Sequence, residues 1–377
     1  MSVQAGVRHL YVHLPFCAHR CGYCDFVTLA GRNERHAGYV DGLLGELHLE
    51  SGMLADSLDT VFLGGGTPTF TEPRELARLL RSLPPASEIT VEANPETITA
   101  ELAALLKEAG VTRVSLGAQS FDPRLLAVLE RRAGPDDVRR AFYHLRDACF
   151  DNISLDLIYG IPGQAAADLR RDLEAAVALG PEHLSCYELE AKPGTRFTHA
   201  WGAELATQAE EMEGYFELVV ATLERAGYRW YETANFCRDG RQARHNLAYW
   251  LGHDYLGLGI GAVSTVEGLR WRNSPKLGVY LGALAAGRRP PRELEALDDD
   301  TRRVERLMLA LRLDEPVELA EVGEAVDADA LDRLITLGLV ETTPRALRLT
   351  RRGRFLGGGV TAELVAEIPA KQVQLTA

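Results

Sequence analysis

The chain has 377 residues, of which 46% are hydrophobic and 25% charged, so it has the composition of a globular protein and the length of a main domain plus a smaller one. The net charge of −13 argues against extensive nucleic-acid binding, which needs a basic face. Six cysteines without a secretory leader, and no apolar run near the ~18 residues of a transmembrane segment, predict a reduced cytoplasmic protein.

Between His9 and about Glu190, short runs rich in β-branched residues alternate with longer helix-like stretches. This alternation predicts a parallel sheet whose strands are joined by crossover helices. We expect strands at residues 10–14, 60–63, 88–92, 113–116, 153–158 and 183–188. Six strands are too few for a closed eight-stranded barrel, so the expected α/β fold is an open, six-stranded partial (β/α)6 barrel.

The first expected strand leads into YVHLPFCAHRCGYCDF, which places Cys17, Cys21 and Cys24 in a C-x3-C-x2-C pattern. Three thiolates on one short loop can converge on one metal centre. On a four-iron cluster they leave one iron open, where chemistry can occur. A structural zinc site that adds His13 or His19 is disfavoured, because zinc sites usually carry C-x2-C pairs separated by a longer loop.

Glycine-rich or polar residues follow the other expected strands, and in such a barrel the loops after the strands form one face. They are residues 64–69 after the second strand, Glu92 on the third, Gln119 after the fourth, Asp156 on the fifth, and Tyr187 and Glu188 on the sixth. Singly, each could be structural, a tight turn for the glycines and a satisfied polar group for the others. As a set they are hard to explain by packing, because burying polar groups is unfavourable without partners.

The cysteine pattern, with Tyr23 directly before the third cysteine, resembles the radical S-adenosylmethionine (SAM) superfamily. The resemblance implies that Cys17, Cys21 and Cys24 hold a [4Fe-4S] cluster and that the amino and carboxylate groups of SAM bind the fourth iron. It also implies electron transfer to the sulfonium and a 5'-deoxyadenosyl radical, if the chemistry is retained.

Six blocks are similar, in order, to the coproporphyrinogen oxidase-like branch of this superfamily, over roughly residues 8–290. They are YVHLPFCAHRCGYCDF, FLGGGTPT, VEANPET, RVSLGAQSF, ISLDLIYGIPGQ and LSCYELEAKPGT. Carried over by position, the resemblance implies that Tyr11, Gly65 and Glu92 contact the cluster-bound SAM. Contacts with this SAM or with a second one are implied for Tyr23, Gly66, Thr67, Gln119, Arg131 and Asp156.

Two functions occur in this branch. The oxygen-independent coproporphyrinogen III dehydrogenase uses the deoxyadenosyl radical to decarboxylate two propionates in porphyrin biosynthesis. The heme chaperone group, HemW, binds SAM, cluster and heme and passes heme to acceptor proteins. Either would accept electrons from a donor such as flavodoxin or ferredoxin.

Three features favour the chaperone group. Phe26 stands where the dehydrogenase has a further cysteine, and only ten residues precede Tyr11 where the dehydrogenase has a long extension. In addition, HNLAYW at residues 245–250 matches the H-N-x-x-Y-W block of the HemW group. One departure is Ala133, where family members usually carry a histidine in R-x-H.

The H-N-x-x-Y-W block suggests a heme contact. His245 could ligate heme iron through a ring nitrogen, with Tyr249 and Trp250 packing on the porphyrin. A histidine bonded to the backbone among core aromatics is the structural alternative, and the sequence leaves both open.

The remaining cysteines and one glycine motif are expected to be structural. Cys149 in helix-like sequence, Cys186 in the sixth strand and Cys237 in a loop are expected to be small buried hydrophobes. GLGIGA at residues 257–262 lacks the spacing of a dinucleotide site, so it predicts a tight packing turn.

The expected domains are the barrel at residues 1–200, a family-specific extension at 201–290 and a winged-helix-like domain at 291–377. In the last, an amphipathic helix at 300–312 precedes two helices and a hairpin. Winged helices often bind DNA, but Glu318, Glu321 and Glu324 would repel phosphates. A lid or a partner-docking module is therefore favoured.

Overall fold

The computed structural model describes residues 6–190 and 196–366, which form two compact units. The first unit runs to Glu295 and contains a large sheet. The second begins at Ala296 and also includes Tyr231–Thr233 and Tyr249–Gly252. Within the described ranges, no helix has the length and apolar character needed to span a bilayer. The three-part division expected from the sequence stays a prediction.

The first unit is built on a nine-stranded sheet. In spatial order its strands are β11 (Leu256–Leu258), β1 (His9–Leu14), β4 (Leu58–Gly65), β5 (Ala86–Ala93), β6 (Arg113–Gln119), β7 (Ile153–Tyr159), β8 (His183–Glu188), β10 (Asn235–Cys237) and β9 (Arg229–Trp230). The six predicted strands are β1, β4, β5, β6, β7 and β8, and each of them is parallel to the next. The partial barrel is therefore confirmed.

Two features of the sheet were not predicted. The short strand β11 adds to β1 in parallel, pairing Leu10 with Leu256, so β1 is not an edge strand. At the other edge, β10 runs antiparallel to β8 and β9 antiparallel to β10. Cys237 lies buried in β10, so its placement in a loop was wrong.

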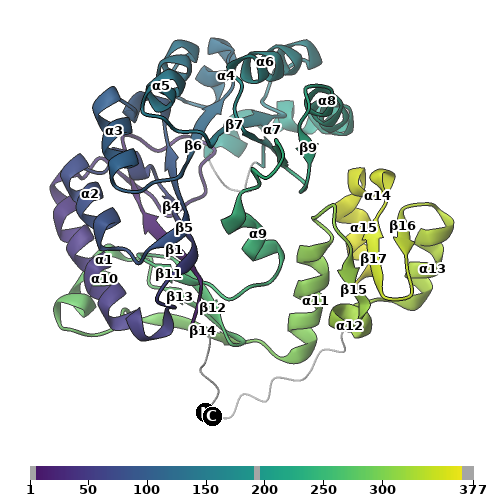
Figure 1. The fold of residues 1–377 in the computed structure, drawn as a ribbon. Coiled ribbons are helices and arrows are strands. Elements are labelled where there is room, and N and C mark those ends of the chain that lie inside the picture. The colour runs from purple at the N-terminus through teal and green to yellow at the C-terminus, as the bar shows by residue number, and fades with distance from the viewer. Residues whose placement is uncertain (1–5, 191–195, 367–377) are drawn as a thin grey trace. The chain divides into compact units, whose positions relative to one another are not determined.

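Helices cover the outer face of this sheet (Figure 1). They include α1 (His36–Glu50), α2 (Pro73–Ser82), α3 (Ala100–Glu108), α5 (Pro135–Asp147), α6 (Ala166–Leu179), α8 (Met212–Arg225) and α10 (Leu277–Ala285). Two further helices are α4 (Pro123–Val128) and α7 (Arg196–Gln208), whereas α9 (Arg244–Trp250) lies on the inner side of the sheet, where His245 stacks on Phe62. Local sequence explains where several begin: the Thr99 side chain accepts a hydrogen bond from the amide of Leu102 at the start of α3, and α2, α4 and α5 each begin with proline.

The strands alternate between an apolar outer face and an inner face that carries mostly polar residues, with Phe62 and Ile158 as apolar exceptions. On β1, Leu10 and Val12 face outward, whereas His9, Tyr11 and His13 share the inner face with their partners on β4. The pairing of neighbouring strands places further polar residues on this inner face. They are Thr60, Glu88, Thr90, Arg113, Ser115, Ser154, Asp156, His183 and Ser185. Most of these side chains are buried, so the inside of the barrel is polar and each member needs a partner.

GLGIGA is a packing turn, as predicted, and its first residues also form β11. The buried carboxylate of Glu46 on α1 accepts hydrogen bonds from the Gly259 amide at 2.8 Å, Asn273 Nδ2 at 2.7 Å and the Tyr280 hydroxyl at 2.6 Å. Asn273 ends β13 (Leu269–Asn273), which pairs with β12 (Val263–Val266) and, in the same small sheet, lies next to β14 (Arg292–Ala296). One carboxylate thus ties the turn to α1, β13 and α10.

Two further cysteine predictions can be compared with the structure. Cys186 is buried in β8, as expected. Cys149 is exposed and lies just beyond the end of α5 with a φ of 63°, so its assignment to the core was wrong. The preceding helix ends at Asp147, and the left-handed backbone turns the cysteine out toward solvent.

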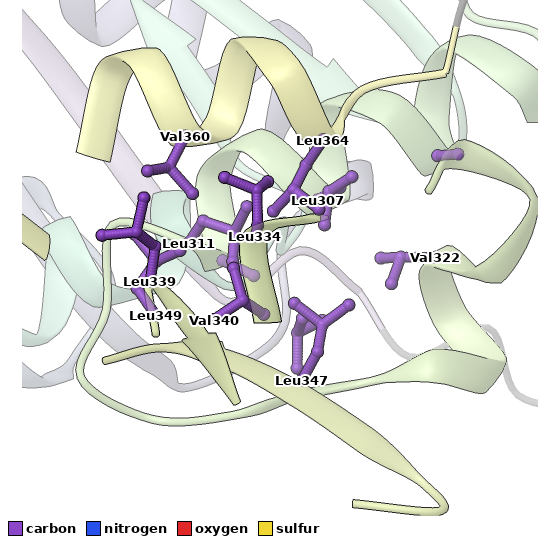
Figure 2. Close-up of a cluster of buried hydrophobic side chains, with 13 residues drawn as sticks. Leu307, Leu311, Val322, Leu334, Leu339, Val340, Leu347, Leu349, Val360 and Leu364 are labelled. Carbon is purple, nitrogen blue, oxygen red and sulfur yellow. The ribbon is translucent and has the colours of Figure 1, made fainter. Parts of the chain in front are cut away.

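The second unit has the predicted winged-helix-like order. It comprises α11 (Asp299–Ala310), β15 (Val317–Glu318), α12 (Leu319–Val322), α13 (Ala328–Thr336), β16 (Val340–Thr342), β17 (Ala346–Leu349), α14 (Arg351–Phe355) and α15 (Gly357–Leu364), with strand order β15-β17-β16. Figure 2 shows its own hydrophobic core, in which Leu307 of α11, Leu334 of α13 and Leu364 of α15 are buried together. Because the core draws on all its main elements, this unit forms a separate cluster of apolar packing.

Candidate functional site

A cavity of about 570 Å³ opens at the carboxyl ends of the parallel strands. Predicted site residues that line it are Cys17, Cys21, Tyr23, Cys24, Gly65, Gly66, Thr67, Glu92, Gln119, Arg131 and Asp156. They come from the loop after β1 and from β4, β5, β6, the segment after α4, and β7. The structure thus brings together residues that are up to 139 positions apart in the sequence, as the loop rule for parallel barrels predicts.

The cysteine loop is closed at its base by a small pair of strands. β2 (Phe16–Cys17) pairs with β3 (Leu29–Ala30), and the Gly31 amide donates to the Cys17 carbonyl at 2.8 Å. Within the loop, the Cys24 amide donates to the Cys21 carbonyl at 3.2 Å. These bonds hold the three half-buried thiols on one short segment that faces the cavity.

Two side chains approach the thiols from the rest of the barrel. The Thr67 hydroxyl donates to Cys17 Sγ at 3.5 Å, and Arg131 Nη1 lies 4.0 Å from Cys21 Sγ. Burial raises the pKa of Cys17 to about 11 and also raises the pKa of Cys21, although both contacts favour the thiolate. Since iron binds thiolates, loading a metal here releases protons.

The donor set suits a polynuclear cluster better than a single ion. A four-iron cluster binds each thiolate at a separate iron, so its ligands stand further apart than those of one ion. Three soft sulfur ligands on one loop, lining one cavity, fit a [4Fe-4S] cluster with one iron open.

The glycine loop after β4 packs directly on the cysteine loop. A Cβ at Gly65 would lie 2.4 Å from the His13 ring, and a Cβ at Gly66 would lie 2.6 Å from the Pro15 carbonyl carbon. The amides of Gly66 and Thr67 donate to the Leu14 and Phe16 carbonyls, both at 2.8 Å. The glycines are therefore required for close packing, and with these amides engaged the loop is left to offer carbonyl oxygens to a ligand.

Two carboxylates, Glu92 and Asp156, line the inner part of the cavity. The Gly65 amide donates to Glu92 Oε2 at 3.2 Å, which links β5 to the glycine loop. Burial, reinforced by the negative charge of Asp156, raises the pKa of Glu92 to about 7. A ligand with an ammonium or sulfonium charge would be attracted here and would favour the ionised pair.

Asp156 is held by a network that the sequence did not reveal. It accepts hydrogen bonds from Ser115 at 3.1 Å and Ser154 at 3.3 Å. Arg113, only 2% exposed, lines the same cavity and donates through Nη2 to the neutral ring of His183 at 3.2 Å. Burial raises the pKa of Asp156, and the positive charge of Arg113 opposes that rise.

Arg113 was missed because a single arginine at the start of a strand looks solvent-exposed in the sequence. Burial lowers the pKa of His183 well below its usual value, so its Nδ1 can accept from the guanidinium. Nε of Arg113 has no hydrogen-bond partner among the described residues. Its positive charge lowers the pKa of both Asp156 and Glu92, against the effect of burial.

A second polar group surrounds Gln119, which has a left-handed backbone with φ 65° at a β6–β7 irregularity. Arg131 Nη2 donates to Asn94 Oδ1 at 2.8 Å and to the Gly117 carbonyl at 2.9 Å, and Asn94 Nδ2 donates to Thr67 at 2.9 Å. A Cβ at Gly117 would lie 2.8 Å from the side-chain Nε2 of Gln119. Such strain in a non-glycine residue is tolerated where it aims a side chain at a site, here into the cavity.

Tyr11 and His245 do not line the cavity but lie one layer beneath it. Both stack on Phe62, with ring centroids 6.2 and 5.2 Å away, and Phe62 itself lines the cavity. His245 is fully buried, and its Nδ1 is hydrogen-bonded to the Thr60 hydroxyl at 2.7 Å. Its neighbour Asn246 does reach the cavity, which the sequence did not single out.

One predicted block is only partly described. Of LSCYELEAKPGT, residues 191–195 lie outside the described residues. Tyr187 and Glu188 at the end of β8 line the cavity as expected.

Comparisons with known proteins agree with this site. Residues 11–176 match the model of the radical SAM superfamily, and residues 297–356 match that of the HemN C-terminal domain. The heme chaperone HemW of Mycobacterium tuberculosis is 38% identical over 370 residues, covering 94% of each chain. The chain belongs to the HemW family.

Other HemW relatives agree. The heme chaperone HemW of Bacillus subtilis is 33% identical, covering 96% of this chain and all of the relative, and that of Escherichia coli is 37% identical over 67% of this chain and 68% of the relative. The structure of coproporphyrinogen III oxidase (HemN) from Escherichia coli matches with a TM-score of 0.81 over 95% of this chain and 90% of that one. At 22% identity, this match shows that the HemW-family chain shares the radical SAM fold of HemN.

Proposed function

We propose that this HemW-family protein is a heme chaperone that binds a [4Fe-4S] cluster, SAM and heme, and transfers heme to acceptor proteins. The observation that carries the proposal is near full-length similarity to relatives named heme chaperone HemW, in a chain whose cavity gathers the cysteine loop and the glycine loop. The presence of Phe26 in place of a further cysteine supports the chaperone over the dehydrogenase.

The residues have separate tasks in this proposal. Cys17, Cys21 and Cys24 would hold the cluster, which supplies an iron with a free coordination position. Glu92 would accept a hydrogen bond from the amino group of SAM, next to carbonyl oxygens of the glycine loop. Asp156, fixed by serine hydroxyls, would accept hydrogen bonds from hydroxyl groups of the nucleoside.

The contacts around Gln119 and Arg131 would complete the pocket. Tyr23 lies on the cysteine loop, and Gly66 and Thr67 lie on the glycine loop, where they would enclose SAM and exclude water. Tyr11 would support the pocket from below through Phe62. A second SAM at Gln119, Arg131 or Asp156 belongs to the same proposal.

The partners follow from the chemistry. A flavodoxin or a ferredoxin would donate electrons to the cluster, and the protein would act in the cytoplasm. The winged-helix-like unit would dock acceptor proteins, since its exposed Leu337 and Leu356 offer apolar contacts and its acidic helices disfavour nucleic acid. The sequence suggests His245 as a heme ligand, but this side chain is fully buried and its Nδ1 is hydrogen-bonded to the Thr60 hydroxyl.

One experiment separates the two functions of this branch. The protein is reconstituted anaerobically, its iron and sulfide are measured, and hemin is titrated by absorbance and then offered to an apo-acceptor. We expect one cluster, saturable heme binding and transfer. Incubation with coproporphyrinogen III, SAM and reductant should yield no protoporphyrinogen; its formation would establish the dehydrogenase instead. Cys17→Ser, which should lose the cluster, is the control for cluster-dependent steps.

A further inference from the structure

Exposed aromatic side chains gather at the mouth of the cavity. In the described ranges, the largely exposed aromatics are Phe26 at 67%, Tyr143 at 57% and Tyr187 at 42%. Phe26 and Tyr187 both line the cavity, although one follows the cysteine loop and the other ends β8. Large apolar groups held open to solvent at the rim of a pocket indicate a surface that a ligand covers.

The cysteine loop adds two further groups to this rim. His19 is half-buried and lines the cavity, and Arg20 is exposed and donates through Nη2 to the Cys24 carbonyl at 3.1 Å. Two acidic side chains, Asp25 on the cysteine loop and Glu188 at the end of β8, also line the cavity. The lining thus combines two flat apolar surfaces, an imidazole, a guanidinium and two carboxylates.

These groups match the chemistry of heme better than the interior does. A porphyrin has two apolar faces, an iron that accepts imidazole nitrogen and propionates that pair with arginine. The inner wall of the cavity carries Glu92, Asp156 and Arg113, against which an apolar macrocycle would be unfavourable. Heme therefore fits the rim, with SAM and the cluster inside.

The buried position of His245 supports the same conclusion. To reach heme iron, its ring would have to leave the Thr60 hydroxyl at 2.7 Å and its stacking on Phe62, and the barrel interior would have to open. His19 needs no such rearrangement, since it already lines the cavity.

We propose that heme binds across the mouth of the cavity, with His19 as an axial ligand of the iron and with Phe26 and Tyr187 against the porphyrin. Arg20 pairs with a propionate. This proposal rests on the proposed function and specifies where that function holds its heme.

The test is hemin titration of the anaerobically reconstituted full chain, followed by absorbance. His19→Ala should shift the Soret band and weaken hemin binding at least tenfold, and His19→Met should give a different spectrum because thioether replaces imidazole. Phe26→Ala and Tyr187→Ala should each weaken binding severalfold. Exposed residues away from the cavity provide matched controls, His48→Ala for the histidine and Tyr143→Ala for the aromatics, and both should bind as the unmodified chain does.

Iron and sulfide content is measured for each variant, because His19 lies between two cluster cysteines. Tyr187 lies outside that loop, so its variant tests the site without disturbing the cluster. An unchanged Soret band and affinity in His19→Ala, or a loss confined to His245→Ala, would overturn the proposal. Failure of the unmodified chain to bind hemin would instead refute the chaperone function itself.

Discussion

The contact between the glycine loop and the cysteine loop can be tested by adding single methyl groups. Gly65→Ala introduces two problems: a backbone φ of 105°, which alanine disfavours, and a Cβ 2.4 Å from the His13 ring. Gly66→Ala introduces only the second, since its Cβ would lie 2.6 Å from the backbone of Pro15. Gly110→Ala introduces only the first, with φ 88° and no atom within 4 Å.

These three changes allow the two costs to be separated. Left-handed backbone costs alanine about 1–2 kcal/mol, so Gly110→Ala should lose about that much unfolding free energy. Overpacking against backbone costs about 1–3 kcal/mol, which we expect for Gly66→Ala. Gly65→Ala should lose roughly the sum, about 2–5 kcal/mol, because both causes act at one residue.

We expect the steric clash, and not the backbone strain, to lower the amount of iron that the site binds. Ordinary contact begins at 3.4 Å, so the Pro15 segment must move by most of an ångström to admit a methyl group at Gly66, and Cys17 lies two residues further on. Urea unfolding measures stability, and iron content after reconstitution measures the site. Gly110→Ala should keep full iron and Gly66→Ala should lose much of it. Equal iron in the two variants would show that the glycine loop does not position the cysteines.

Three further predictions concern the buried charges. With a pKa of about 7, Glu92 ionises as pH rises, so SAM should bind about tenfold more tightly at pH 8 than at pH 6 in anaerobic equilibrium dialysis, and Glu92→Gln should flatten that dependence. Arg113→Met should raise the pKa of Asp156 further and so weaken SAM binding at neutral pH, with a smaller loss as the pH rises. Arg113→Lys, which keeps the charge, should bind nearly normally, and an equal loss in both variants would exclude charge as the cause. Burial raises the pKa of Glu46 to about 7, so Glu46 holds its proton more tightly in the folded state than in the unfolded state. The free energy of unfolding should therefore fall as the pH rises from 5 to 8. In thermal denaturation Glu46→Gln should lack this dependence on pH, and the same dependence in the variant would exclude Glu46 as its source.

The main strands and the cavity were accessible from the sequence because each carries a local pattern. Apolar alternation marks the strands, and a glycine run or a polar residue marks the end of each. The resemblance to radical SAM proteins added roles that patterns alone could not provide, such as those of Gln119 and Arg131. Of the predicted site residues, all except Tyr11 and His245 line the cavity.

What was missed depends on contacts between distant segments. β11 has three residues and becomes a strand only through pairing with β1, about 245 positions away in the chain. Arg113 and Asn94 look like ordinary surface residues until the sheet places them beside Asp156 and Arg131. His245 could not be assigned to the interior because nothing near it in the sequence indicates Thr60 as its partner.

The pairing of β1 with β11 has a consequence for how the chain is made. A ribosome completes β1 first, yet the segment that protects its outer edge, Leu256–Leu258, emerges only after all the other strands of the large sheet. Until then β1 has an open edge, which can pair with another nascent chain. A fragment that stops at residue 200 would keep that edge permanently, so we expect it to aggregate even though it contains all the cysteines of the loop.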